Sequence, residues 1–313
     1  MQMWNAMINT PIAYFIFNRP RHTRETFAAI RAQQPAKLFI IADGPRQGHA
    51  TDAERCKEVR GIVEAIDWPC EVHRNYSDEN LGLKRRVSSG LDWVFEQVDR
   101  AIVLEDDCLP HADFFNYCEA MLDRYENDVR VWVITGNNFQ GGHRRGDAAY
   151  YFSKYSHCWG WATWRRAWQH YKGDLPFWPK WGSTKDWRKK VPDPVERKYW
   201  ANIFDKVRRN EFDSWAYPWI GCVWYHGGLT ATPNVNLVTN IGFGPDGTHT
   251  LAIEDEEGIS TQPLGLLTHP DRIEQNKRAD KYVFDHVFGG YSQKLLPKTL
   301  TLVKRVIRKL RGK

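Results

Sequence analysis

Strand-length runs, most of them apolar, alternate with helix-length segments through the first 140 residues, and this alternation constrains the fold more than any other feature. The strand-like runs cover 11–17, 37–42, 70–74, 101–104 and 129–135, and the helical patterns cover 23–33, 51–66, 83–98 and 114–125. Short runs that are apolar at nearly every position fit strands buried on both faces. Strands joined by helices in this way predict an α/β fold with a mostly parallel central sheet and helices on both faces.

The chain is long enough, at 313 residues, to bury a core without metal or disulfide cross-links. Its six cysteines are far apart and include no C-x-x-C, so we expect them to be small buried side chains. No apolar run approaches the ~18 residues of a membrane span, and no secretory signal pattern opens the sequence, which favours a cytoplasmic protein. We expect one domain over 1–290, divided into halves 11–140 and 141–290. Within it, Thr51 and Glu54 have the spacing of a capping box at the start of a helix.

The excess positive charge lies in the C-terminal tail. The formal net charge is +6, but residues 294–313 hold eight basic side chains and no acidic ones, which leaves a net charge of −2 on the rest. Apolar residues recur in the tail at helical spacing, at Leu296, Leu300, Val303, Ile307 and Leu310. The sequence predicts a basic amphipathic helix over 291–313 that binds the anionic surface at the inner face of a membrane. A helix docked on its own domain is the alternative, and nucleic acid is not expected as a partner.

Carboxylates directly follow two of the predicted strands. Glu105, Asp106 and Asp107 come after 101–104, and Asp43 comes after 37–42. The carboxyl ends of neighbouring parallel strands form the usual ligand-binding edge of such a sheet. Three adjacent carboxylates repel one another unless a cation or water screens them, and their oxygens suit Mg²⁺ or Mn²⁺. For the cluster alone, a solvated turn that opens the next helix is the alternative.

Aromatic residues are unusually frequent, with 15 Trp, 13 Tyr and 15 Phe, and most of the tryptophans lie in the second half. Trp and Tyr offer flat apolar faces with polar edges, which match the faces and hydroxyls of sugar rings. We expect some of them to line a cleft, with Trp159 and Trp161 as candidates, and about half of the tryptophans in 159–168 to be core. Arg165 and Arg166 follow and are candidates for phosphate contacts.

These motifs resemble those of bacterial glycosyltransferases of the GT-A fold, a Rossmann-like fold, in their family 2-like form that uses nucleotide-diphosphate sugars. The resemblance rests on Asn18-Arg19-Pro20 after the first strand, Asp43-Gly44 after the second, Asn80-Leu81-Gly82-Leu83-Lys84, and Glu105-Asp106-Asp107, an E-D-D form of the D-x-D motif. It also includes the Trp-Gly-Trp segment 159–161, although the Glu-Asp pair that follows in some relatives is absent. The resemblance covers mainly residues 11–140.

The resemblance implies roles for single residues. Asp107 would bind Mn²⁺ or Mg²⁺, and a later histidine, His249 in the Gly-rich segment 242–249, would complete the metal shell. The implied donor-binding residues are Asn18, Arg19, Asp43, Asn80, Lys84, Glu105, Asp106, Trp159 and Trp161.

The catalytic base is expected in the aromatic-rich second half, because carboxylates that bind the metal lie on the leaving-group side of the donor. Asp213 lies between Phe212 and Trp215, at the head of a helix predicted through 217–225, and is the candidate base. The alternative is that Asp213 only caps that helix.

The sequence therefore predicts a metal-dependent, inverting glycosyltransferase of the hexosyl- or N-acetylhexosaminyl-transferase class, acting in cell-surface polysaccharide assembly. The expected partners are a nucleotide-diphosphate sugar, with a UDP-sugar favoured, and a glycan or lipid-linked acceptor. A sugar nucleotidyltransferase is one alternative, although residues 18–21 lack the glycines of a phosphate-binding loop. A non-catalytic glycan-binding protein is the other.

Overall fold

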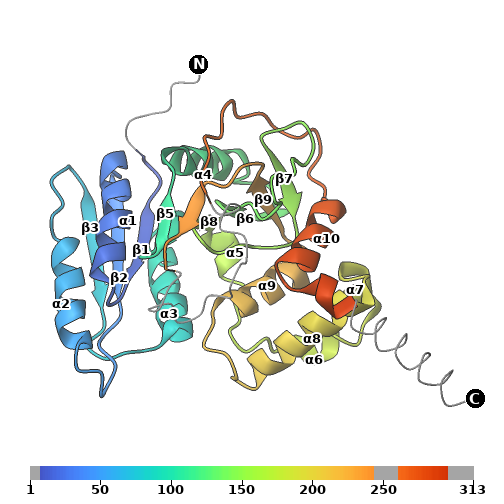
Figure 1. The fold of residues 1–313 in the computed structure, drawn as a ribbon, viewed down its shortest axis with the longest axis horizontal. Coiled ribbons are helices and arrows are strands. Elements are labelled where there is room, and N and C mark those ends of the chain that lie inside the picture. The colour runs from blue at the N-terminus through green and yellow to red at the C-terminus, as the bar shows by residue number, and fades with distance from the viewer. Residues whose placement is uncertain (1–7, 243–259, 295–313) are drawn as a thin grey trace, which may run out of the picture.

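The computed structural model describes residues 8–242 and 260–294, and its centre is an eight-stranded sheet in the order β3-β2-β1-β4-β8-β6-β9-β7 (Figure 1). The strands are β1 (Ile12–Ile16), β2 (Lys37–Ala42), β3 (Glu71–Tyr76), β4 (Arg100–Glu105), β6 (Val131–Thr135), β7 (Tyr150–Ser153), β8 (Trp161–Trp164) and β9 (Leu229–Pro233). All but β7 and β8 run in one direction, so the sheet is mostly parallel, as predicted.

Helices cover both faces of this sheet. On one face pack α1 (Pro20–Gln33), α2 (Asp52–Ile62) and α4 (Ala112–Arg124). On the other pack α3 (Leu83–Phe95), α5 (Arg165–Trp168), α6 (Trp178–Trp181), α7 (Lys185–Lys190), α8 (Pro194–Arg208) and α9 (Ala216–Tyr225). In β1, Tyr14 and Ile16 enter the first core while Ala13 and Phe15 enter the second, so the whole strand is buried. The predicted α/β fold class is confirmed.

The N-terminus of α2 differs from the prediction. Thr51 is the N-cap residue, but its side chain makes no capping hydrogen bond, so the capping box does not form. Asp52 instead is buried and binds the side chains of Asn18 and Arg46. The start of α2 is therefore held by tertiary contacts rather than by its own sequence.

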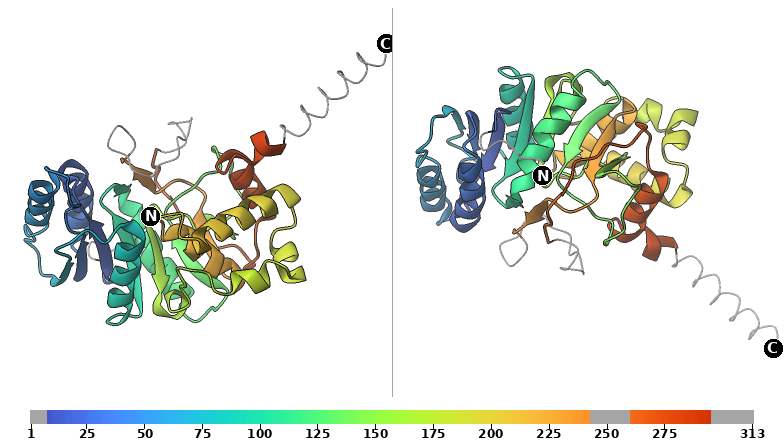
Figure 2. Two further views of the ribbon diagram at one scale, coloured as in Figure 1. Left: turned by 90° about the horizontal axis from the view of Figure 1, so that it is seen from below. Right: turned by 90° about the horizontal axis from the view of Figure 1, so that it is seen from above.

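Two further elements of the second half border the edge where the parallel strands end. β10 (Val238–Asn240) pairs with β5 (Cys108–Pro110) in a two-stranded antiparallel sheet, and the N–H of Ile241 donates to the Asp107 carbonyl at 2.8 Å. α10 (Lys277–His286) lies on the same side of the molecule as α8 and α9 (Figures 1 and 2). Most of the Gly-rich segment, with His249, and the tail from 295 onward lie outside the described residues.

Most tryptophans of the second half form a core rather than a cleft. Six of them are almost completely buried: Trp161, Trp168, Trp200, Trp215, Trp219 and Trp224. Trp161 in β8 stacks on Trp215 with ring centroids 5.2 Å apart. This packing joins the sheet to the helices of the second half.

The remaining expectations concern cysteines and membrane spans. All six cysteines are free thiols. Cys56, Cys108, Cys118 and Cys222 are buried, as expected, but Cys70 and Cys158 are only partly buried. In the part of the chain that the structure describes, no helix is both long and apolar enough to cross a bilayer.

Candidate active site

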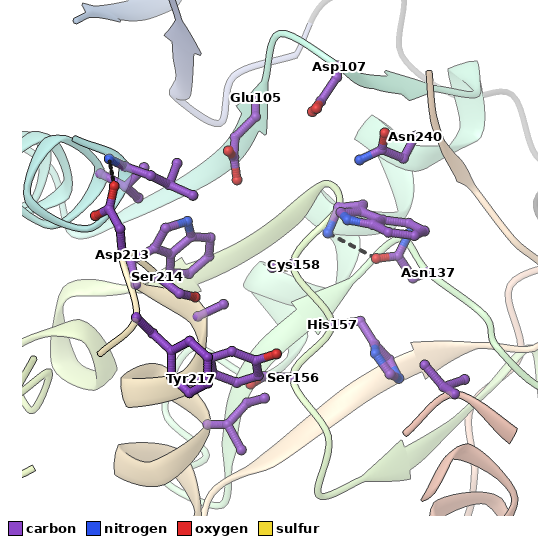
Figure 3. A pocket seen from close by; sticks show the side chains of 18 of the residues that line it. Glu105, Asp107, Asn137, Ser156, His157, Cys158, Asp213, Ser214, Tyr217 and Asn240 are labelled. Carbon is purple, nitrogen blue, oxygen red and sulfur yellow. Dashed lines mark hydrogen bonds between the residues drawn. The ribbon is translucent and has the colours of Figure 1, made fainter. Parts of the chain in front are cut away.

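The residues that follow β1, β2 and β4 meet at one edge of the sheet, because these strands are adjacent and parallel. A cavity of about 1310 Å³ lies at this edge. Asp43 and the carboxylates of residues 105–107 line it from the first half, and residues of α9, of α10 and of 155–159 line it from the second. Figure 3 shows Glu105 and Asp107 opposite Ser156, His157 and Tyr217. The cavity therefore joins the predicted strand-end residues to the aromatic half of the chain.

Asp43 is buried at the end of β2 and held in one orientation. Its Oδ1 accepts hydrogen bonds from the backbone N–H groups of Gly44 and Leu81, both at 2.9 Å. Its Oδ2 accepts one from Asn80 Nδ2 at 3.0 Å, and Asn80 also donates to the Gly44 carbonyl. Burial raises the pKa of Asp43, and the two backbone N–H groups oppose that rise. Asp43 and Asn80, both predicted donor residues, thus form one hydrogen-bonded unit in the cavity wall.

Asn18 supports the cavity from behind instead of lining it. Its Nδ2 donates to Asp52 Oδ1 at 2.8 Å, and Arg46 donates to the same carboxylate at 2.7 Å. Arg46 lies over the ring of Phe17, 5.4 Å from its centroid, and these two side chains do line the cavity beside Asp43. Asn18 is therefore not among the lining residues; together with Asp52 it positions Arg46, which lines the cavity with Phe17.

Arg19 lies across the carboxylates that follow β4. Its Nη1 donates to Asp107 Oδ2 at 2.8 Å, and its Nη2 lies 3.2 Å from Asp106 Oδ1. Burial opposes the charged form of Arg19, but the two carboxylates outweigh it and raise the arginine's pKa. Burial also raises the pKa of Glu105 and of Asp106, and repulsion from Asp107 adds to both rises. One guanidinium thus faces three carboxyl groups. If all three are ionised, their negative charge exceeds the single positive charge of Arg19, so a further cation could bind there.

A divalent cation fits the carboxylates of residues 105–107 if a bound ligand supplies the remaining oxygen ligands. Within 8–242 and 260–294, no three His, Cys, Asp or Glu side chains are grouped as a metal site. Asp107 has 14% of its side chain exposed toward the cavity, and its Oδ2 is shared with Arg19. Mg²⁺ and Mn²⁺ are commonly held by one or two carboxylates together with substrate phosphates. Asp107, with Asp106 beside it, fits that arrangement.

Asp213 lines the cavity but caps α3 rather than the helix that follows it. Its Oδ2 accepts from the N–H of Leu83 at 2.9 Å and its Oδ1 from the N–H of Lys84 at 2.8 Å (Figure 3). The N-cap of α9 is Trp215, so the predicted place of Asp213 at the head of that helix is wrong. The N-cap of α3 is Gly82, which has no side chain to bind these N–H groups, and Asp213 supplies the missing acceptor.

Three other predicted donor residues take different positions. Trp159 lines the cavity. Trp161 is 1% exposed and lies behind Trp215, so it supports the wall instead of contacting a ligand there. Lys84 directs its Nζ to Asn210 at 3.3 Å and is not among the lining residues.

Arg165 and Arg166 do not reach the cavity. Arg165 donates to the carbonyl of Phe95 and pairs with Asp99 at 2.9 Å, while Arg166 donates to the carbonyls of Tyr125 and Val131. They bind backbone carbonyls of neighbouring segments, so they are not placed to contact a phosphate in this cavity.

Several lining residues had no clear signal in the sequence. Ser156 and His157 come from the loop between β7 and β8, Asn137 follows β6, and Tyr217 comes from α9. Asn137 Oδ1 accepts a hydrogen bond from the N–H of Trp159 at 3.0 Å, which fixes the loop. Burial lowers the pKa of His157 to about 3, so its ring is neutral near pH 7. Only Asn137 could have been suspected, because it directly follows a predicted strand.

Comparison with known proteins gives distant likenesses. No family model matches the chain. A mannosyltransferase from Pyrobaculum calidifontis in complex with GDP-Man and Mn²⁺ aligns with a TM-score of 0.37 and 10% identity, over 72% of each chain. An apo UDP-glucose pyrophosphorylase aligns with a TM-score of 0.29 and 12% identity, over 51% of this chain and 79% of that one. The first was solved with a nucleotide sugar bound, and the second is named for a nucleotide sugar. At these values the likeness assigns no residue, and function has to be argued from the cavity.

Proposed function

We propose that the protein is a glycosyltransferase that moves a sugar from a nucleotide-diphosphate donor to a glycan or lipid-linked acceptor. The observation that carries the proposal is the single cavity of about 1310 Å³ that connects Asp43 and Asp107 with the aromatic second half. A transferase must hold two substrates in contact. This cavity has carboxylates at one side and aromatic side chains of the second half at the other, which provides two chemically different regions.

The donor would occupy the first-half side, within residues 11–140. Asp43 offers a carboxylate fixed by Asn80 and two backbone N–H groups, suited to a nucleoside N–H or hydroxyl. Phe17 and Arg46 offer a ring and a guanidinium beside it for a base such as uracil. Asp107, with Asp106, would hold Mn²⁺ or Mg²⁺, which when bound neutralises charge on the diphosphate leaving group.

The acceptor would occupy the side formed by 141–290, and Asp213 is the proposed base of an inverting displacement. A carboxylate that already accepts two backbone N–H groups keeps a further lone pair on each oxygen. It is also held rigidly in the cavity wall, as a base needs to be. We extend the proposal to a hexosyl- or N-acetylhexosaminyl-transferase of cell-surface polysaccharide assembly at the inner face of a membrane, with the basic tail as the membrane contact.

The first test measures donor binding by thermal shift of the full chain. UDP, GDP, ADP, CDP and dTDP are each added with and without Mn²⁺. We expect at least one diphosphate, UDP first, to raise Tm only with the metal; ligand at ~100 times its Kd stabilises by about 2.7 kcal/mol. If no diphosphate shifts Tm under either condition, the proposal fails.

The second test separates the reaction classes. Incubation with a nucleotide sugar and an acceptor mixture should release the nucleoside diphosphate and a glycosylated product. Pyrophosphate-dependent formation of a nucleoside triphosphate would instead identify a sugar nucleotidyltransferase. Binding of a glycan without turnover of any nucleotide sugar would identify a glycan-binding protein.

A further inference from the structure

The cavity is larger than one ligand requires. Sites for single small molecules usually measure about 300–1,000 Å³, whereas this one measures about 1310 Å³. Both Asp107 and Tyr291, which follows α10, line it. A nucleotide sugar at the carboxylate end therefore leaves the α10 end for a second molecule.

Four aromatic residues, Tyr282, His286, Phe288 and Tyr291, line the α10 end. Tyr282 stacks on His286 with ring centroids 3.9 Å apart and an angle of 16° between the rings. His286 faces Tyr291 with centroids 6.4 Å apart and an angle of 29°. Tyr291 is 61% exposed. It is the most exposed tyrosine, followed by Tyr225 at 43%. We call Tyr282, His286 and Tyr291 the aromatic wall.

The aromatic wall is anchored rather than loose. At Gly141, which has φ +55°, a Cβ would lie 2.3 Å from the hydroxyl oxygen of Tyr282, so only glycine allows this approach. At Gly290, a Cβ would lie 2.4 Å from a ring carbon of Phe284, which fixes the chain just before Tyr291. After it, Lys294 Nζ lies 2.7 Å from carboxylate oxygens of Asp193 and of Asp285. Tyr291 is thus presented to the cavity by contacts on both sides.

A buried polar atom belongs to another residue that lines the same cavity. Ser156 is 5% exposed, and its Oγ has no hydrogen-bond partner among the described residues. Ser156 lines the cavity near Tyr217, with its Oγ turned into the wall (Figure 3). A buried hydroxyl without a partner costs free energy, which a hydrogen bond to a ligand hydroxyl would recover once the Ser156 side chain rotated toward the cavity.

The surroundings of the aromatic wall favour a glycan over a lipid chain. Arg145 lies over Tyr282, 5.4 Å from its ring centroid, and the adjacent Lys281 is 67% exposed. An acyl chain at this position would bring apolar surface against charged groups that need water or polar partners. Sugar rings can stack their C–H faces on the aromatic side chains while their hydroxyls bind the charged groups.

We propose that the acceptor is a glycan of at least two sugar rings. The ring that carries the attacking hydroxyl lies beside Ser156, and the preceding ring packs on the exposed face of Tyr291 and His286. The inference rests on the proposed function, because it assigns the second substrate of the same cavity.

The test uses the full chain with UDP and Mn²⁺ and a printed array of mono- to tetrasaccharides, followed by calorimetric titration of the strongest ligand. The variants are Tyr291→Ala, Tyr291→Phe and, as a matched control, Tyr225→Ala. Tyr225 is also an exposed aromatic residue, but it stacks on Phe177 and is not among the lining residues.

We expect oligosaccharides to bind more tightly than any monosaccharide. Tyr291→Ala should raise the Kd of the oligosaccharide by on the order of tenfold, the scale of one lost ring contact, and leave monosaccharide binding unchanged. Tyr291→Phe, which keeps the ring, and Tyr225→Ala should both behave as the wild type. Equal affinities for Tyr291→Ala and the wild type, or no bound oligosaccharide, would overturn the inference. If the metal-dependent nucleotide shift is still present, the proposed function survives that result; if it is absent, the proposed function fails first.

Discussion

At the scale of single residues, the contact between Arg19 and Asp107 decides how a cation can enter the site. Asp107 shares its Oδ2 with Arg19, so an incoming metal and the guanidinium compete for the same carboxylate. Asp107→Asn keeps the shape of the side chain and removes its charge. We expect the Mn²⁺-dependent part of the nucleotide thermal shift to disappear, while the protein alone stays folded.

The control for this variant is Asp186→Asn, since Asp186 is 78% exposed and lies on α7, outside the cavity lining. It should retain the full metal-dependent shift. An unchanged shift in Asp107→Asn would remove Asp107 from the metal site.

Asp213 caps α3 and is the proposed base, and substitutions can separate these two roles. Asp213→Asn replaces one acceptor oxygen with an NH₂ group facing a backbone N–H of α3. We expect a loss of about 1 kcal/mol in the free energy of unfolding, as for other lost caps. As the proposed base, its replacement should also lower turnover by on the order of a hundredfold or more. Chemical denaturation and initial rates measure the two effects.

Gly82→Ala provides the comparison for Asp213→Asn. Gly82 has φ +78°, and a Cβ there would lie 3.0 Å from Asp213 Oδ2, so the variant disturbs the same cap without removing the carboxylate. We expect lower stability with much of the turnover retained. If both variants lose turnover equally, Asp213 is a positioning residue and the base lies elsewhere.

His157 makes stability depend on pH. It is buried between the rings of Phe139 and Tyr155, and burial lowers its pKa to about 3, below the ~6.5 of an unfolded chain. Between these values the unfolded state binds one more proton, so stability falls as the pH falls, by about 1.4 kcal/mol per pH unit. His157→Gln should therefore lose less stability than the wild type between pH 6.5 and pH 5, by about 2 kcal/mol.

Denaturation at several pH values measures this difference. The groups with raised pKa near β4 contribute equally to both proteins and cancel in the comparison. His49→Gln, at an exposed position, should follow the wild-type curve. Parallel curves for His157→Gln and the wild type would show that His157 is protonated in the fold.

At the scale of elements, Gly90 determines how closely α3 lies on the sheet. A Cβ at Gly90 would lie 2.7 Å from Phe15 Cε1 and 2.9 Å from Ile41 Cγ2. Helix propensity favours alanine over glycine by about 1 kcal/mol, but overpacking a core costs about 1–3 kcal/mol. The steric cost is larger, so we expect Gly90→Ala to lower the free energy of unfolding.

Gly61→Ala is the matched substitution in α2. No atom lies within 4 Å of a Cβ built there, so only the propensity gain remains. We expect Gly61→Ala to raise Tm and Gly90→Ala to lower it, as measured by thermal denaturation. Stabilisation by both would mean that α3 can move away from β1 and β2 at little cost.

The elements also show how far the sequence alone could predict the molecule. β2 spans 37–42 as predicted, because a strand buried on both faces requires an unbroken apolar run. The position of Asp43 at the sheet edge follows from the end of that run. The cap of α3 by Asp213 joins residues 130 positions apart, so no local pattern contains it. Trp161 was ambiguous for a similar reason, since a tryptophan in a core and one in a sugar site look alike until tertiary packing places them.

At the scale of the whole molecule, Lys294 links the start of the tail to the cavity, which Asp285 lines. Lys294, the first basic residue of the tail, binds Asp285 of α10 and Asp193 at the start of α8. The chain therefore leaves the described fold next to the aromatic wall. A membrane contact made by the tail would bring the α10 end of the cavity close to the bilayer, where acceptors of cell-surface assembly would be found.

Deleting residues 295–313 tests this arrangement, because it removes seven basic residues and keeps Lys294 with its two ion pairs. Each Lys or Arg near an anionic surface contributes about 1 kcal/mol. We therefore expect the affinity for phosphatidylglycerol-containing vesicles, measured by co-sedimentation, to fall more than a hundredfold. The Tm and the nucleotide-induced thermal shift should stay unchanged. Pure phosphatidylcholine vesicles should bind both proteins equally weakly.

Replacing Lys304, Arg305, Arg308 and Lys309 by glutamine should reproduce most of the loss, since it keeps the apolar stripe and removes the charge. Unfolding of the truncated protein would instead mean that the tail packs on its own domain, and unchanged vesicle binding would place the membrane contact elsewhere.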